Sequence, residues 1–214
     1  MNVSILLATF GHSRWRDLAH EHALPSCYDQ DPWQVITLHQ EHGTLAQARN
    51  SAAEMATGDW LCFLDADDRL GVGYIDAMRL ACDNHRDDDA MHGRFDQDYL
   101  LVPAMQFVIP HTGECVGTPE IPAWGQPLIE VNCACIGTLV PTSLFREVGG
   151  FREHPLYEDW DLWLRCVKAG AALIPVRDAV YCARGGPGGR NLPSELDRHH
   201  AYWTIRNEHQ EAFS

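Results

Sequence analysis

Short apolar segments alternate with segments of helical periodicity along the first ninety residues. Three apolar runs have the length of buried strands, at Val3–Thr9, Gln34–Leu38 and Trp60–Leu64. Helices are predicted between these runs and after them: a short one ending at His22, one opening at Thr44, and one over Tyr74–Asn84. This alternation is typical of a parallel sheet with crossover helices.

Two local signals bound the helix that opens at Thr44. Thr44 and Gln47 have the spacing of a capping box, in which each residue's side chain accepts from the other's backbone N–H. Gly58 stands where a left-handed C-terminal turn is expected.

The second half of the chain has a different pattern. The segments Tyr99–Ile109 and Cys115–Val116 are predicted to form an antiparallel hairpin across residues 111–114. A strand is predicted over Cys133–Val140. Helices are predicted over Thr142–Val148 and Trp160–Lys168, and two final strands over Ala172–Val176 and Ala179–Ala183. Residues 117–126 and 185–189 are rich in Gly and Pro and are predicted to be loops. These patterns together predict an α/β fold with a mixed, mostly parallel central sheet, flanking helices and a small antiparallel sheet.

Composition and charge remove several classes of function. The chain has 214 residues, with 16 Lys and Arg against 30 Asp and Glu, a net charge of −14. That balance disfavours binding to nucleic acid through phosphate contacts and binding to membranes through a polybasic patch. The chain shows no apolar run close to the roughly 18 residues of a membrane helix and no basic segment typical of a secretion signal. We therefore expect a soluble, cytoplasmic protein without a membrane span, whose eight cysteines are reduced.

A first acidic cluster, Asp65-Ala66-Asp67-Asp68, follows directly after the third predicted strand. In an open α/β sheet, ligands bind beyond the carboxyl ends of the strands. Two carboxylates that converge there are stabilised by a cation, and oxygen ligands suit Mg²⁺ or Mn²⁺ when phosphate supplies the remaining ligands. The tetrapeptide fits equally well a turn in which Asp side chains bind the backbone.

A second acidic cluster, Glu158, Asp159 and Asp161, lies at the start of the last predicted helix. Acidic residues favour helix N-termini because of the helix dipole, which is one explanation of the cluster. The alternative is that Glu158 or Asp159 precedes the regular turns, projects into a cleft and acts as a general base. Asp161 lies further into the helix, where a structural role is expected.

The two clusters and their neighbours resemble family-2 glycosyltransferases of the GT-A fold. The resemblance spans roughly residues 3–183 and rests on five blocks in matching order and spacing: Ala48-Arg49-Asn50, Ala56-Thr57-Gly58-Asp59-Trp60, Phe63-Leu64-Asp65-Ala66-Asp67-Asp68, Ser143–Phe151 and Tyr157–Arg165. It implies metal-dependent, inverting transfer of a sugar from a nucleoside-diphosphate donor to a hydroxyl group. It also implies a domain over residues 1–193, with a nucleotide-binding half (1–92) and an acceptor-side catalytic half (93–193), followed by a polar helix or tail (194–214).

The resemblance implies roles for seven residues. Asp159 matches the catalytic base and Glu158 its neighbour, whereas Asp67, assisted by Asp65, matches the ligands of a divalent cation, Mn²⁺ or Mg²⁺. The remaining matches are donor-binding positions: Asp65 at the ribose, Arg49 near the nucleotide, and Thr9 and Phe10 framing the base.

The chain departs from the family pattern in three segments. Ala8-Thr9-Phe10-Gly11 stands where the family has Pro-Thr-Tyr-Asn after the first strand. Leu38–His42 occupies the place of the aspartates that read the base, so that Glu41 or His39 is the available substitute. Ala183-Arg184-Gly185-Gly186 occupies the place of a metal-binding histidine, and Arg184 or Arg190 is either a phosphate contact or a solvated loop residue.

The acceptor stays open at this stage: a glycan, a small molecule, a protein or a hydroxylated base in modified, phage-type DNA. A catalytically inactive module that binds a nucleotide sugar or glycan is the alternative function. The C-terminal helix is a candidate for covering the cleft or for pairing two subunits in a homodimer.

Overall fold

Within residues 1–92, 98–109, 114–117, 128–184 and 194–212, which a computed structural model describes, eight strands form one mixed sheet. The strand order is β2-β1-β3-β7-β5-β8-β4, and β6 pairs with β5. The strands are β1 (Val3–Phe10), β2 (Gln34–Gln40), β3 (Trp60–Phe63), β4 (Arg69–Leu70), β5 (Tyr99–Val108), β6 (Cys115–Gly117), β7 (Leu139–Pro141) and β8 (Ala172–Arg184). Strands β1, β2, β3, β5 and β8 share one direction, and β4, β6 and β7 oppose it. The mostly parallel sheet predicted from the sequence is therefore confirmed.

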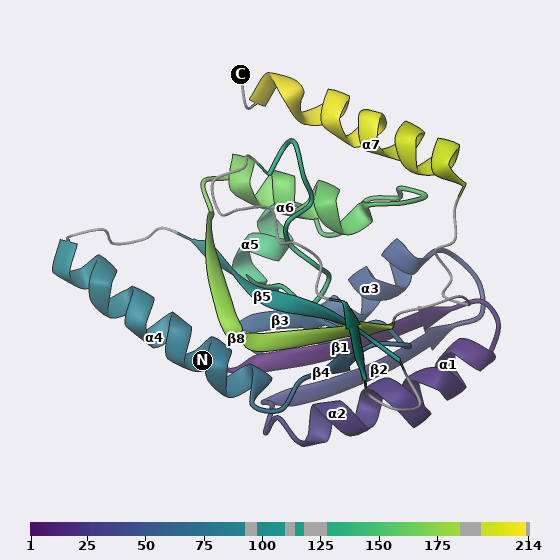
Figure 1. Ribbon diagram of the computed structural model, residues 1–214, viewed down its shortest axis with the longest axis horizontal. Coiled ribbons are helices and arrows are strands. Elements are labelled where there is room, and N and C mark those ends of the chain that lie inside the picture. Colours follow the sequence, from purple (N-terminus) through teal and green to yellow (C-terminus); the bar gives the residue numbers. More distant parts are fainter. Residues whose placement is uncertain (93–97, 110–113, 118–127, 185–193, 213–214) are drawn as a thin grey trace.

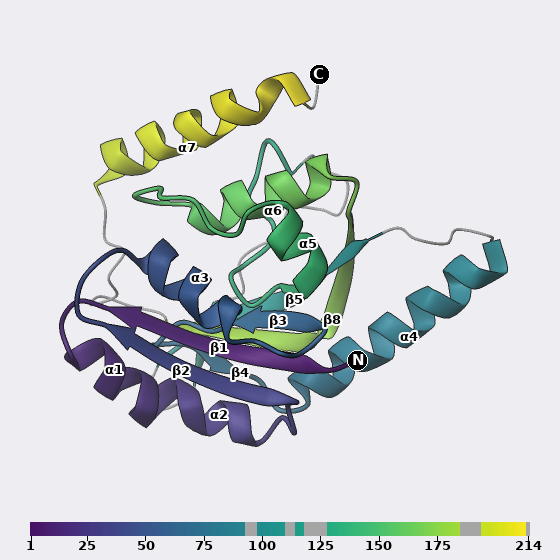
Figure 2. The same cartoon turned by 180° about the vertical axis from the view of Figure 1, so that it is seen from behind.

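Helices cover both faces of the sheet (Figure 1). They are α1 (Arg14–Leu18), the π-helical turn η1 (Ala19–Ala23), α2 (Leu24–Tyr28), α3 (Leu45–Glu54), α4 (Tyr74–His92), α5 (Thr142–Glu147), α6 (Glu158–Lys168), α7 (Glu195–His209) and the short 3₁₀ turn η2 (Gln210–Ala212). Figure 2 shows α1, α2 and α4 on one face, α3, α5 and α6 on the other, and α7 outside α6. In the described ranges no helix combines the length and the apolar character that a bilayer crossing requires.

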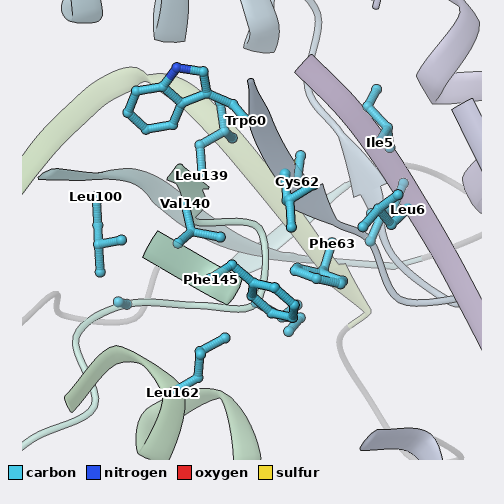
Figure 3. Close-up of a cluster of buried hydrophobic side chains, with 14 of the residues drawn as sticks. Ile5, Leu6, Trp60, Cys62, Phe63, Leu100, Leu139, Val140, Phe145 and Leu162 are labelled. Atoms are coloured by element: carbon cyan, nitrogen blue, oxygen red, sulfur yellow. The ribbon is translucent and has the colours of Figure 1, made fainter. Parts of the chain in front are cut away.

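A continuous core joins β3 to the helices that follow β7 (Figure 3). The Phe63 ring lies 5.5 Å from the Phe145 ring and 4.8 Å from the Phe151 ring, centroid to centroid. Truncating a buried aromatic side chain of this kind costs about 3–5 kcal/mol. The packing therefore fixes the carboxyl end of β3, where the first acidic cluster begins, relative to the segment that carries the second.

Three predicted elements differ from the observed ones. Instead of ending at His22, helical structure runs from Arg14 to Tyr28. Helix α4 continues to His92, beyond its predicted end at Asn84. Only Leu139–Pro141 of the predicted strand Cys133–Val140 is a strand, because residues 133–138 turn back on themselves through a hydrogen bond from the Thr138 N–H to the Cys135 carbonyl (3.0 Å).

The two predicted final strands are one strand, β8. Val176 pairs with Pro103 and Val180 with the next residue, Ala104, so the residues between them form a bulge. Pro103 has no N–H to donate to the neighbouring strand. A bulge in β8 beside this position is therefore expected.

The predicted left-handed turn at Gly58 is wrong. Helix α3 ends at Glu54, and the φ of Gly58 is not positive. A Cβ at Gly58 would lie 2.8 Å from the Asn2 carbonyl oxygen and 2.9 Å from the Ser4 nitrogen. The position therefore needs glycine for close approach to the start of β1. The predicted loops 117–126 and 185–189 lie outside the described residues, apart from Gly117.

Candidate active site

Both acidic clusters contribute to one cavity of about 510 Å³ beside the carboxyl end of β3. The first cluster supplies Asp65 and Asp68, and the second supplies Glu158 and Asp159 at the start of α6. Apolar side chains of β5, among them Met105 and Phe107, complete the wall together with Asn132–Ile136. The arrangement is the mostly apolar hollow with a few convergent polar groups that is typical of a substrate site.

One buried guanidinium joins the two clusters. Arg49, on α3, is 3% exposed, and its Nη2 lies 2.6 Å from Asp65 Oδ1 while its Nη1 lies 2.6 Å from Glu158 Oε1. The Phe151 ring lies below it, 5.1 Å from the guanidinium carbon. Although burial opposes the charge, Asp65 and Glu158 raise the pKa of Arg49. Acidic groups 93 positions apart, from residue 65 to residue 158, therefore meet on one cation.

Helix α3 is held against the segment that leads into α6. The confirmed capping box of Thr44 and Gln47 begins the helix, and the Gln47 side chain also donates to Glu153 Oε1 (2.8 Å). One turn later the Asn50 side chain accepts from the Phe151 N–H (2.8 Å) and donates to the Phe151 carbonyl (2.9 Å). These bonds explain why an Arg-Asn pair stands on this face of α3. Asn50 holds the loop that leads into α6, and Arg49 binds Glu158, where that loop ends.

Asp159 stands in the first turn of α6, next to a strained residue. Tyr157, the residue before the helix, has φ +63°, a left-handed conformation that non-glycine residues rarely adopt. The Asp159 Oδ1 accepts from the Trp160 N–H (2.7 Å) and from the Asn132 side chain (3.3 Å). Glu158 and Asp159 thus belong to the helix, rather than preceding it as predicted.

The electrostatic setting of Asp159 suits a base that works near neutral pH. Burial, with Glu158 beside it, raises the pKa of Asp159 to about 7, although Arg49 and the two hydrogen bonds oppose the rise. A carboxylate with a pKa near the working pH removes a proton most effectively.

Asp68 is fixed by β8 rather than directed to a ligand. Its Oδ2 accepts from the Tyr181 hydroxyl (2.7 Å) and its Oδ1 from the Arg184 N–H (2.8 Å). Burial, with Asp65 and Asp67 nearby, raises the pKa of this carboxyl group to about 8. Tyr181 also accepts from the Asp65 N–H (3.3 Å), so one buried hydroxyl orders two residues of the acidic cluster.

Tyr181→Phe is expected to lower the free energy of unfolding by about 1–3 kcal/mol, because a buried Asp68 oxygen loses its partner. Urea unfolding of the variant and of Tyr28→Phe provides the comparison, since Tyr28 is 67% exposed. Equal stabilities of the two variants would contradict the role given to the Tyr181 hydroxyl.

Within the first acidic cluster, Asp65 and Asp67 offer carboxylate oxygens of the kind that a divalent cation binds. Asp68 has both oxygens engaged, and Asp65 has one oxygen bound to Arg49. Asp67 is partly buried and is not part of the cavity wall. A donor set of two carboxylates fits Mg²⁺ or Mn²⁺, which complete their shell with phosphate oxygens and water.

The described residues contain one cluster of three possible metal ligands, and it lies elsewhere, at His154, Asp161 and Glu208. Asp161 is fully buried there and already accepts from Arg165 (2.8 Å to Nη2) and contacts His209 Nε2 (2.8 Å). Although burial opposes ionisation, these bonds lower the pKa of Asp161 to about 2. This cluster is therefore an ion-pair network, and the structural role predicted for Asp161 is confirmed.

The predicted contacts to the nucleotide base lie outside the cavity wall. Thr9 is 5% exposed, and its Oγ1 lies 2.9 Å from His39 Nδ1, between β1 and β2. Phe10 and Glu41 are likewise absent from the residues that line the cavity. The backbone of Arg184 holds Asp68, whereas Arg190 lies outside the described residues.

Two cysteines line the cavity, and neither is prepared to act as a nucleophile. Burial raises the pKa of Cys133, and it raises the pKa of Cys135 to about 12. Both thiols are therefore protonated at neutral pH, and the thiolate is the reactive form. All eight cysteines are free, as expected for a reduced protein.

Sequence reasoning missed Asn132 and Tyr181. Asn132 lies in a turn and Tyr181 in the middle of a strand, and no local motif marks either of them. A search for polar side chains on the segments that flank the two acidic clusters in space would have found them, but this requires the sheet topology.

Comparisons with known proteins give one family model and one curated relative. Residues 16–106 match the model of glycosyl transferase family 2. The uncharacterized protein y4gI of Sinorhizobium fredii is 27% identical over 163 residues, which is 74% of this chain and 17% of that protein.

Solved structures share the fold. The crystal structure of residues 1–349 of S. aureus TarS aligns with a TM-score of 0.63 at 16% identity, over 96% of this chain and 64% of that one. The same fragment in complex with UDP-GlcNAc aligns with a TM-score of 0.64 at 15% identity, over 96% and 65%. The chain therefore spans less than two thirds of these relatives.

Proposed function

We propose that this chain is a family-2 glycosyltransferase with the GT-A fold, and that it transfers a sugar from a nucleoside-diphosphate donor to a hydroxyl acceptor. A nucleotide-sugar donor is supported by the structural relative solved with UDP-GlcNAc. We propose inversion at the anomeric carbon, because direct attack by the acceptor hydroxyl, with Asp159 as its base, is a single displacement.

The single observation that carries the proposal is the meeting of both acidic clusters on Arg49 at one cavity. The first cluster stands at the carboxyl end of β3, where ligands of open α/β sheets bind. The second cluster brings Asp159 to the same cavity. A donor diphosphate at Asp65, with Asp67 two residues further along the chain, and an acceptor hydroxyl at Asp159 would face each other across it.

In this mechanism Asp159 accepts the proton of the acceptor hydroxyl as that oxygen attacks the anomeric carbon. The bond between this carbon and the diphosphate oxygen breaks, and its electron pair leaves with the nucleoside diphosphate. A base in this role contributes about 10²–10⁴-fold to the rate. Arg49 holds Glu158 and Asp65 in position, and Asn132 orients the Asp159 carboxylate.

A divalent cation would be held by Asp67 with the help of Asp65. When bound, Mn²⁺ or Mg²⁺ neutralises the negative charge that develops on the departing diphosphate, which is worth several kcal/mol in the transition state. The two carboxylates are too few to hold the ion alone, so the phosphates of the donor complete the site.

Asp67→Ala is expected to abolish the Mn²⁺-dependent part of donor affinity. Calorimetry with a panel of nucleoside diphosphates, with and without Mn²⁺, measures this effect. Asp76→Asn is the matched control, because the Asp76 side chain is 78% exposed on α4. An unchanged dependence on Mn²⁺ in Asp67→Ala would remove Asp67 from the cation site.

The activity itself is tested by release of nucleoside diphosphate from a panel of nucleotide sugars. Release from at least one donor supports a transferase, and binding of a donor without release from any would indicate an inactive module.

The division into a nucleotide-binding half (1–92) and a catalytic half (93–193), the cytoplasmic location and the homodimer are further parts of the proposal. A salt-sensitive shift of DNA in a gel would favour a DNA acceptor.

A further inference from the structure

The first turns of α7 border the substrate cavity. Arg198 lines the same cavity as Glu158 and Asp159. A second hollow of about 370 Å³ lies beside it; Leu156 lines both, and the second includes Asp197 and His200 in its wall. Helix α7 is thus part of the site although it follows the rest of the domain in sequence, because it supplies part of the cavity wall.

Buried contacts fix α7 against α6. The Tyr202 ring stacks on the Trp160 ring at 5.4 Å and 30°, and the Tyr202 hydroxyl donates to the Glu130 carbonyl (3.1 Å). At the far end of the helix, His209 contacts Asp161, and both side chains are buried. Figures 1 and 2 show α7 lying across the outer side of α6 in both views.

This packing fixes Arg198 relative to the base. Trp160 directly follows Asp159, and Tyr202 lies four residues after Arg198, so the two α7 side chains share one face of the helix. Arg198 lines the same cavity as Asp159, where the acceptor hydroxyl lies in the proposed reaction.

Among the described residues that line the cavity, one cationic group is open to a ligand. Asp65, Asp68, Glu158 and Asp159 line it, and Arg49 has both of its terminal nitrogens bound to carboxylates. Among the residues that the structure describes, the Arg198 guanidinium has no hydrogen-bond or ion-pair partner. A guanidinium binds carboxylate or phosphate through paired hydrogen bonds, and an acidic cavity would otherwise repel an anion.

We propose that Arg198 binds an anionic group, a phosphate or a carboxylate, on the acceptor. The inference rests on the proposed glycosyl transfer and names its acceptor class: a hydroxyl compound that carries a negative charge within reach of α7. Arg198 is a specificity-determining residue in this proposal, and the chemistry at the anomeric carbon is unchanged.

The test compares acceptor pairs that differ by one anionic group: glycerol with glycerol 3-phosphate, glucose with glucose 6-phosphate, and methyl glucoside with methyl glucuronide. Nucleoside diphosphate release above the rate without acceptor gives kcat/KM for each. The wild type is expected to prefer a charged member by about tenfold or more, and R198Q to lose that preference. R198K keeps the positive charge but not the paired N–H donors of the guanidinium, and is expected to retain part of the preference. K168Q removes an exposed positive charge at the far end of α6 and is the matched control.

The outcomes separate this inference from the proposed function. Absence of nucleoside diphosphate release from every donor overturns the transferase and this inference with it. If the wild type releases nucleoside diphosphate but shows no preference for any charged acceptor, or R198Q keeps the preference, the Arg198 assignment alone is overturned. An R198Q variant whose donor dissociation constant rises as much as its acceptor kcat/KM falls would place Arg198 at the donor. The phosphate and carboxylate pairs distinguish which anion the site prefers.

Discussion

Asp159→Asn is expected to lower turnover by at least about 100-fold while the donor dissociation constant changes little. The substitution keeps the shape of the side chain and its place in the first turn of α6 but removes the lone pair that accepts the proton. In the proposed mechanism, donor affinity depends on Asp65 and Asp67. Release of nucleoside diphosphate measures turnover, and calorimetry measures the dissociation constant. Turnover near that of the wild type would mean that the base lies elsewhere, with Glu158 the next candidate.

The pH profile provides an independent check on the same residue. Because burial raises the pKa of Asp159 to about 7, the carboxylate is protonated below that pH and cannot act as a base. Turnover of the wild type is therefore expected to rise as the pH increases through about 7 and then to level off. The Asp159→Asn variant is expected to lose this rise. A wild-type profile that is flat between pH 6 and 8 would contradict the assignment.

Much of the first half of the fold could be predicted because its signals are local. The strands β1, β2 and β3 are apolar runs, and the capping box of α3 needs only residues 44 and 47. The carboxyl end of β3 then follows from the sequence, and with it the position of the first acidic cluster. The π-helical turn at Ala19–Ala23 could not be predicted, because residues 14–28 contain no periodicity that distinguishes it from an α-helix.

The second half depends on partners that are distant in sequence. The bulge that joins two predicted strands into β8 exists because Pro103 stands opposite it in β5. The segment from Cys133 to Thr138 has the composition of a strand but folds into a turn beside the cavity. Likewise, Gly58 carries the signature of a helix end, yet its glycine is required by the backbone of β1.

The candidate site was predictable as a list of acidic residues and not as a geometry. The two clusters could be recognised from the sequence, but their meeting on Arg49 follows only from the docking of α3 against the loop before α6. The contact of Asn132 with Asp159 and the packing of Tyr202 on Trp160 likewise depend on tertiary structure, and no periodicity in the sequence predicts them.

Arg49→Met is expected to lower the free energy of unfolding by about 2–4 kcal/mol. Removing one partner of a buried ion pair costs about 3–5 kcal/mol because the other charge stays without compensation. The lower range applies here since the Asp65 and Glu158 side chains keep 30% and 20% of their exposure. Methionine fills a similar volume above the Phe151 ring, so the loss reports charge rather than packing. Urea unfolding at pH 7 measures it.

A matched variant and a double variant identify the cause of that loss. Arg16→Met removes an exposed arginine that pairs with Asp17 and is expected to cost less than about 1 kcal/mol. Adding Glu158→Gln to Arg49→Met removes one of the two stranded carboxylates and is expected to recover part of the stability, a coupling that a double-mutant cycle measures. A double variant whose loss equals the sum of the two single losses would show that Arg49 and Glu158 act independently. The contact between Arg49 and Glu158 would then contribute nothing to stability, and the packing of the hydrophobic core would fix the positions of the two clusters.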